Sequence, residues 1–125
     1  MSVLVDSSVW IDYFRGLGNT HILNFLIDEN LLVTNELILA ELIPYLKLRK
    51  QRKVISLLNQ IEKCSLKINW KDIIDLQVKC LQKGVNKVGI PDIIITQNAI
   101  QNHLSLYTFD KHFKLMSEHI PLLLY

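Results

Sequence analysis

The sequence has few of the residues that cross-link small domains. Only two of its 125 residues are cysteine, Cys64 and Cys80, and they form no Cys-x-x-Cys or Cys/His spacing. This pattern indicates neither a zinc site nor a disulfide framework. We therefore interpret both residues as thiols of a hydrophobic core in a protein that resides in a reducing compartment.

Long apolar runs are also missing. No uninterrupted apolar stretch approaches the roughly 20 residues of a membrane-spanning helix, and Asp6 interrupts the first apolar segment before it could form a signal peptide. We expect a cytoplasmic protein that does not enter a membrane. There is no internal repeat, low-complexity tract or linker, so residues 1–125 are predicted to form a single domain. The net charge of +2 permits nucleic acid as a partner without requiring it.

The apolar residues that are present form very short runs separated by helical patterns. The runs predicted to be strands are 3–5, 31–33, 104–107, 122–124 and, more weakly, 66–68. The segments predicted to be helices are 8–15, 20–27, 36–46, 51–61, 70–83 and about eleven residues after Pro91. Alternation of this kind is typical of an α/β fold with a mainly parallel sheet of four to five strands, covered on both faces.

Carboxylates follow two of the predicted strands directly. Asp6 comes after the first strand, ahead of Ser7 and Ser8, and Asp110 follows the run that ends at Tyr107. In open α/β sheets, ligands bind at the carboxyl ends of the strands, so both acids are site candidates. The alternative for Asp6 is that it only caps the helix that follows it.

Glu41 lies in a helix that is apolar around almost its whole circumference, which predicts a buried helix. A buried carboxylate must be protonated, bound to a metal or paired with an Arg or Lys. Its neighbour Glu36 needs no such explanation, because the helix dipole favours a negative charge in the first turn. Pro44 is expected to kink or end this helix.

Asp92 falls in the first turn of the helix that follows Pro91, where it could equally be a surface acid stabilised by the helix dipole. His112, close to Asp110, is the nearest approach to a general base. Nothing in the sequence pairs this histidine with a nucleophile, so an ordinary surface or capping role is the simpler interpretation.

The four acids share an electrostatic problem if the fold brings them to one crevice. Two carboxylates 4 Å apart repel by roughly 4 kcal/mol at an effective dielectric of 20, so a cluster needs protons or a cation. Oxygen ligands without His or Cys select Mg²⁺ or Mn²⁺ over Zn²⁺. Ser7, Ser8 and Thr108 could then orient a water or a phosphate oxygen.

One dense run of positive charge follows the Glu41 helix. Five basic residues occupy seven positions, namely Lys47, Arg49, Lys50, Arg52 and Lys53. Such a run is either a solvated face or an attractor for a phosphate backbone or an acidic partner segment.

Four segments resemble, in order and spacing, the acidic motifs of PIN domains, and specifically those of the small VapC-type ribonuclease toxins. These segments are 3–8, 40–42, 91–95 and 108–113. The resemblance spans the whole chain and implies a three-layer α/β/α sandwich with Mg²⁺- or Mn²⁺-dependent endoribonuclease activity through a metal-bound water. It also implies a homodimer and inhibition by a cognate antitoxin.

By the same resemblance, Asp6, Glu41, Asp92 and Asp110 are the catalytic, metal-binding acids, and Ser7 and Thr108 support them. The chain departs from the family pattern in two places. Residues 80–83 lack the Arg often found there, and Thr96 and Gln97 replace small residues. These departures bear on substrate or antitoxin contacts rather than on the metal site.

Other readings fit less well. A haloacid-dehalogenase-type phosphatase needs a second Asp where this chain has Ser8, and a receiver domain needs a second acid where it has Ser7. A non-catalytic RNA- or protein-binding module on the same fold stays open as an alternative, although such a module would be expected to lose some of the four acids.

Overall fold

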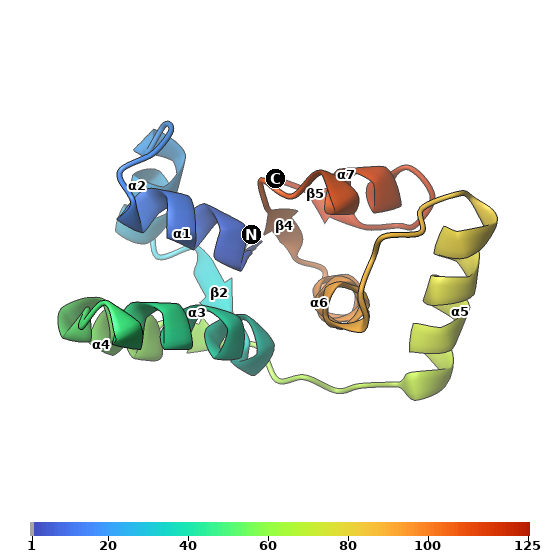
Figure 1. Ribbon diagram of the computed structural model, residues 1–125, viewed down its shortest axis with the longest axis horizontal. Helices are drawn as coiled ribbons and strands as arrows, with labels where there is room; N and C mark the ends of the chain where they lie inside the picture. Colours follow the sequence, from blue (N-terminus) through green and yellow to red (C-terminus); the bar gives the residue numbers. More distant parts are fainter. Residues whose placement is uncertain (1) are drawn as a thin grey trace.

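The computed structural model describes residues 2–125, and over this range five parallel strands form one sheet in the order β3-β2-β1-β4-β5 (Figure 1). The strands are β1 (Val3–Val5), β2 (Leu32–Thr34), β3 (Glu62–Lys63), β4 (Ser105–Tyr107) and β5 (Leu123–Leu124). The helices are α1 (Ser7–Phe14), α2 (His21–Asp28), α3 (Glu36–Leu48), α4 (Arg52–Gln60), α5 (Trp70–Gln82), α6 (Ile90–Gln101) and α7 (Lys111–Ser117).

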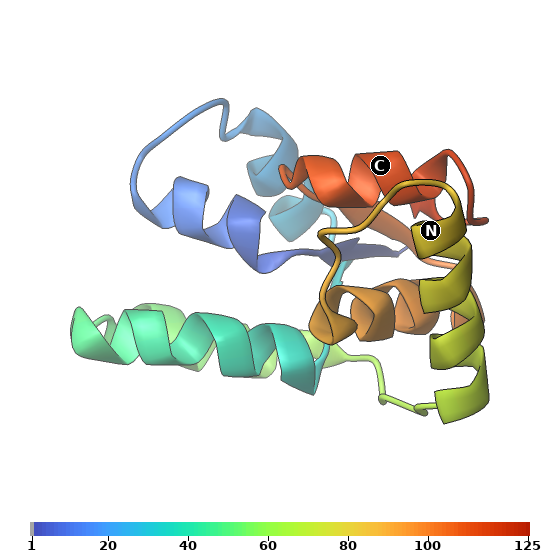
Figure 2. The same cartoon turned by 45° about the vertical axis from the view of Figure 1, so that its right-hand side comes forward.

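The sheet is the middle of three layers, as predicted. Helices α1 to α4 lie on one side of it and α5 to α7 on the other (Figures 1 and 2). Successive residues of a strand point to opposite faces, so Val3 and Val5 of β1 join the core under α1 to α4 while Leu4 joins the core under α5 to α7. All three side chains are buried, which explains why this strand is a continuous apolar run.

The prediction of a strand at 66–68 is wrong, and β3 lies earlier, at Glu62–Lys63. This strand pairs with β2 at the edge of the sheet, and both of its side chains are exposed. An exposed edge strand carries charged residues instead of an apolar run, so hydrophobic patterning could not find it.

Pro44 was expected to kink or end its helix, and the structure excludes the second outcome, because α3 continues to Leu48. Proline removes the backbone hydrogen bond to the carbonyl four residues earlier, which here belongs to Ala40. Both Ala40 and Pro44 are exposed, so water can solvate the released carbonyl.

Helix α5 covers the sheet with less of its apolar surface than its periodicity predicts. Ile73 and Cys80 are buried, but a stripe of large apolar side chains faces solvent, namely Trp70, Ile74, Val78 and Leu81. Leu57 of α4 is 63% exposed as well. The sequence correctly identified amphipathic helices, but nothing in the described chain covers these parts of their apolar faces.

Buried polar side chains tie the two helical layers together. Asn35 caps α3 by accepting a hydrogen bond from the backbone N–H of Ile38 at 2.8 Å. Its amide nitrogen donates to Oδ1 of Asn98 on α6 at 3.0 Å, and Asn98 in turn donates to the Ser65 carbonyl at 3.0 Å. We call the hydrogen-bonded residues Asn35, Asn98 and Ser65 the asparagine clamp. It fixes α3 against α6 and against the segment after β3.

Within residues 2–125, no helix is both long and apolar enough to cross a bilayer.

Candidate active site

Asp6 lies at the carboxyl end of β1, in the middle of the sheet, and only 4% of it is exposed. It occupies the N-cap position of α1, yet its side chain makes no capping hydrogen bond. Its Oδ2 atom instead accepts hydrogen bonds from the hydroxyls of Ser8 at 2.8 Å and Thr108 at 2.9 Å. Helix capping therefore does not account for this buried carboxylate.

The direction of these two hydrogen bonds is fixed by the backbone around them. The Ser8 hydroxyl accepts from the N–H of Phe109 at 3.1 Å, and the Thr108 hydroxyl accepts from the N–H of Asp110 at 3.0 Å. Both hydroxyl protons consequently point at Oδ2 of Asp6. Residues 2–125 provide no hydrogen bond to Oδ1 of Asp6, so this oxygen stays available to a ligand.

Sheet pairing brings the two chain segments together. Strands β1 and β4 are parallel neighbours, and the N–H of Asp6 donates to the carbonyl of Tyr107 at 2.9 Å. Thr108 follows Tyr107 directly and therefore lies beside Asp6, although about a hundred residues separate them in sequence. The prediction that these strand ends share one edge is confirmed by the pairing of β1 with β4.

Glu41 is exposed, so the prediction of a buried carboxylate in an apolar surround is wrong. Helix α3 is apolar nearly all round because it contributes to both cores, through Ile38 on one side and Leu42 on the other, and only a narrow strip is left uncovered. The Glu41 carboxyl still loses part of its hydration. This desolvation raises its pKa, and the charges of Asp6 and Asp92 add to the rise.

Asp92 is the third residue of α6, which begins after the N-cap Gly89. Desolvation is the largest cause of its raised pKa, followed by the negative charge of Asp110, with a smaller contribution from Asp6. The Gly89 backbone N–H and His112 oppose the rise. The dipole of α6 is therefore not its only electrostatic partner, because neighbouring carboxylates perturb it as well.

Asp110 has a structural task that the other acids lack. Its Oδ1 atom accepts a hydrogen bond from the backbone N–H of His112 at 2.9 Å and caps α7. Nδ1 of the same histidine lies 3.0 Å from this oxygen. His112 is thus a partner of a site carboxylate rather than a base paired with a nucleophile.

The four predicted acids come from four separate places in the chain and lie within electrostatic reach of one another, and we call the region between them the acidic crevice. Asp6 follows β1, Glu41 comes from α3, Asp92 from α6, and Asp110 from the end of the segment after β4. Their mutual effects on the pKa values of Glu41 and Asp92 mark them as electrostatic neighbours.

The sequence named three hydroxyl side chains that could support the site, Ser7, Ser8 and Thr108. Thr108 and Ser8 both donate hydrogen bonds to the Asp6 carboxylate. Ser7 is the half-buried first residue of α1. The predicted contact surface runs from the last turn of α3 to the first turn of α4, and all of its residues are exposed; these are Lys47, Arg49, Lys50, Arg52 and Lys53. The guanidinium of Arg49 stacks on the Tyr45 ring at 3.6 Å. Whether this run contacts RNA or an antitoxin stays a prediction.

The donor set of the crevice fits a hard divalent cation, because it consists of carboxylates, without thiolates or a free imidazole pair. In the part of the chain that the structure describes, no three acidic, His or Cys side chains already stand in a complete coordination cluster. Mg²⁺ commonly takes only one or two protein carboxylates and keeps several waters.

In buffer without divalent cations, we expect Glu41→Gln to be more stable than the wild type near neutral pH. Because the folded state raises the Glu41 pKa, it binds the proton more tightly than the unfolded state, and stability falls as pH rises from the ordinary carboxyl pKa through the raised one. Glutamine has no proton to lose. Thermal unfolding between about pH 4 and pH 8 should show a difference that widens with pH; a constant difference would contradict the prediction.

Comparison with known proteins supports the same architecture. The family model for the PIN domain matches residues 3–118. The chain is similar to one in the crystal structure of VapBC2 from Rickettsia felis bound to a DNA fragment from their promoter, with a TM-score of 0.78 and 20% identity over 100% of this chain and 98% of that one. It is also similar to a chain of FitAcB from Neisseria gonorrhoeae, with a TM-score of 0.72 and 17% identity over 98% and 96%. No curated protein sequence matches it.

Proposed function

This chain belongs to the PIN domain family, and on that premise we propose that it is a divalent-metal-dependent endoribonuclease that hydrolyses phosphodiester bonds of RNA. PIN domains are generally nucleases. The observation that carries the proposal is Asp6, a buried carboxylate with one oxygen held by two hydroxyls and the other left available.

The four carboxylates would hold Mg²⁺ or Mn²⁺, with Oδ1 of Asp6 as the best-oriented ligand. When bound, the ion lowers the pKa of a water and neutralises charge that develops on the phosphate. Ser8 and Thr108 keep the Asp6 carboxylate in one orientation by donating to its other oxygen. The negative charges that raise the pKa values of Glu41 and Asp92 in the metal-free protein are the ones that a bound cation would neutralise.

The decisive assay is hydrolysis of a labelled single-stranded RNA in Mn²⁺ or Mg²⁺. We expect internal cleavage by the wild type, loss of cleavage in EDTA, and recovery when the metal is restored. Asp92→Asn should be inactive under all three conditions. Binding of RNA without any cleavage would contradict the nuclease and favour the alternative, a non-catalytic binding module on this fold.

We further propose that the chain is the toxin of a type II toxin–antitoxin pair that acts in the cytoplasm. The support is the similarity of its fold to chains of the VapBC2 and FitAcB complexes. A second support is an apolar groove of about 340 Å³ between α1, α2 and α4, away from the acidic crevice. This groove offers a surface on which a protein inhibitor can dock.

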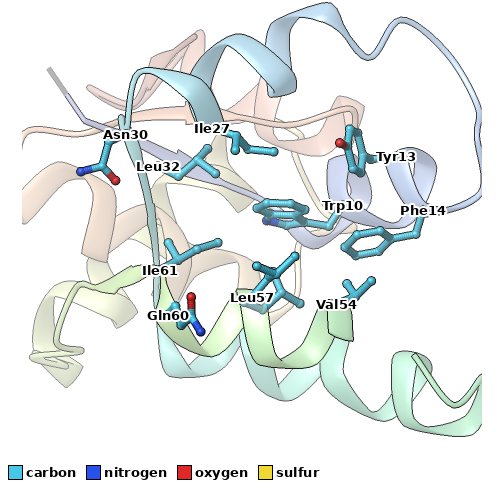
Figure 3. Close-up of a pocket in the computed structure, with 11 residues that line it drawn as sticks. Trp10, Tyr13, Phe14, Ile27, Asn30, Leu32, Val54, Leu57, Gln60 and Ile61 are labelled. Atoms are coloured by element: carbon cyan, nitrogen blue, oxygen red, sulfur yellow. The ribbon is translucent and has the colours of Figure 1, made fainter. Parts of the chain in front are cut away.

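Trp10 is the centre of that groove. Figure 3 shows its indole ring among apolar side chains, with Ile27 on one side and Leu57 on the other. Trp10 is only 4% exposed, and its indole N–H has no hydrogen-bond partner in residues 2–125. Leu57, in contrast, is 63% exposed at the groove, so apolar side chains of an antitoxin segment would cover it.

For any antitoxin that neutralises the wild-type chain in a growth-arrest assay, we expect Leu57→Glu to weaken binding by about tenfold or more. An interface leucine buried against apolar partners contributes about 1.5–3 kcal/mol, and a charge in its place also has to be desolvated. The matched control is Leu115→Glu, which alters an exposed leucine of α7 that lies outside this groove and outside the α5 stripe. Neutralisation of Leu57→Glu at wild-type antitoxin levels would refute this docking site.

The homodimer implied by the resemblance remains part of the proposal. Its support is the exposed stripe on α5, because an apolar patch of this kind often marks a protein interface. Sedimentation equilibrium on the chain alone tests it.

A further inference from the structure

A second hollow, separate from the groove around Trp10, adjoins the acidic crevice. Its volume is about 360 Å³, and it shares Thr108 and Asp110 with the crevice. The remaining lining residues are Leu106, Phe109, Lys111, Lys114, Leu124 and Tyr125. A ligand in this hollow would therefore lie next to a group bound at the four carboxylates.

Two aromatic rings at this hollow face solvent although they are held in place from behind. Phe109 is 49% exposed and Tyr125 is 51% exposed. Both rings pack against Tyr107, which is buried, with ring centroids 5.4 Å and 5.8 Å away from it. Since Tyr107 fixes both of them, the two exposed rings form a preoriented surface rather than freely moving side chains.

Two lysines place positive charge beside the acidic crevice. Lys111 and Lys114 are exposed and lie three positions apart on α7, so they share one face of the helix. The carboxylates repel a phosphate backbone, and these cations at the rim attract it. Exposed aromatic rings beside cations are the combination with which proteins bind single-stranded nucleic acid.

We propose that this hollow is a subsite for one unpaired base of the RNA substrate, adjacent to the phosphate that is cleaved. The base stacks on Phe109 or Tyr125, and the flanking phosphate contacts Lys111 and Lys114. Leu106 and Leu124 form the rest of the wall, and apart from the lysines the polar side-chain groups are those of Thr108 and Asp110 and the hydroxyl of Tyr125. Stacking therefore dominates over reading of base edges, and the subsite accepts any base that is not held in a duplex. The position of the base next to the cleaved phosphate rests on the proposed nuclease function. The binding of a base in this hollow does not depend on that function.

The test measures binding in the Asp92→Asn background, where hydrolysis is blocked. The probe is a short single-stranded oligoribonucleotide that contains 2-aminopurine, whose fluorescence is quenched when it stacks on an aromatic ring. We expect Phe109→Leu and Tyr125→Leu each to raise Kd by about 5- to 100-fold and to reduce the quenching. Phe109→Tyr and Tyr125→Phe should keep the parent's affinity and its fluorescence quenching, because each variant preserves an aromatic ring. Phe25→Leu, at an aromatic residue of α2 that is 51% exposed and outside the hollow, is the matched control.

Further arms separate this proposal from the proposed function. Lys111→Gln combined with Lys114→Gln should make binding less dependent on salt, and a duplex of the same sequence should bind more weakly than the single strand. Affinity within twofold of the parent in both leucine variants would overturn the proposal, as would equal binding of the duplex or no binding of RNA at all. Cleavage by the wild type is scored in parallel, so a failed nuclease is recognised independently of the subsite.

Discussion

Asp6→Asn is expected to lower RNA cleavage by more than about 100-fold while leaving the fold intact. Loss of a group that only supports a metal ligand typically costs about 10- to 100-fold, so the loss of the ligand itself should exceed that range. Asparagine keeps the shape and can still accept one hydrogen bond from Ser8 or Thr108 through its carbonyl oxygen. What it removes is the negative charge on the oxygen that faces the crevice.

Two further variants show whether the loss of cleavage is specific to Asp6. Thr108→Val removes one hydroxyl that donates to Asp6, and its cleavage rate should fall by about 10- to 100-fold, less than in Asp6→Asn. Asp75→Asn changes an exposed acid on α5 and should cleave like the wild type. Initial rates at saturating Mn²⁺, together with circular dichroism spectra, provide the measurement. If Asp6→Asn retained a tenth or more of the wild-type rate, Asp6 would not be the central ligand.

Asn98→Ala is expected to destabilise the protein by about 2–4 kcal/mol, the largest stability effect that we predict for a single polar residue. Asn98 is 2% exposed and joins Asn35 to the Ser65 carbonyl in the asparagine clamp. Its truncation leaves the buried amide of Asn35 without a partner, which costs about 1–3 kcal/mol, and removes the hydrogen bond to the carbonyl of the exposed Ser65, which contributes about 0.5–1.5 kcal/mol.

Urea denaturation measures this loss as a lower midpoint with an unchanged slope. Asn59→Ala, on the exposed side of α4, is the control and should change stability by less than about 0.5 kcal/mol. Because the clamp also sets α3 against α6, which carry Glu41 and Asp92, the variant should lose cleavage activity even at temperatures where it stays folded. A change of stability no larger than in Asn59→Ala would show that water replaces the lost bonds.

The sequence was informative where a buried apolar segment and a functional polar residue are adjacent in the chain. Val3–Val5 are apolar because this strand is buried on both faces of the sheet. Asp6 was conspicuous because its charge ends the apolar run. The edge strand Glu62–Lys63 leaves no such mark, since both of its side chains face water. Likewise the helical wheel of α3 could not reveal that two cores share this helix and leave Glu41 at an open strip between them.

Contacts between remote segments were the least predictable. Nothing local distinguishes Ser8 from Ser7 as the partner of Asp6, because the choice depends on where the backbone of Phe109 passes. The hollow beside Phe109 and Tyr125 likewise depends on Tyr107 lying beneath both rings, which the pairing of β4 with its neighbours determines.

The pairing of β1 with β4 also determines when the crevice can exist during synthesis. Val3 is in register with Ser105, so the first strand waits for a partner that the ribosome adds about a hundred residues later. Until then Asp6 has neither the Thr108 hydroxyl nor the Asp110 carboxylate beside it. Domains fold as units once enough of the chain has emerged. A nascent chain that stops short of β4 therefore carries its first site acid without a complete site around it.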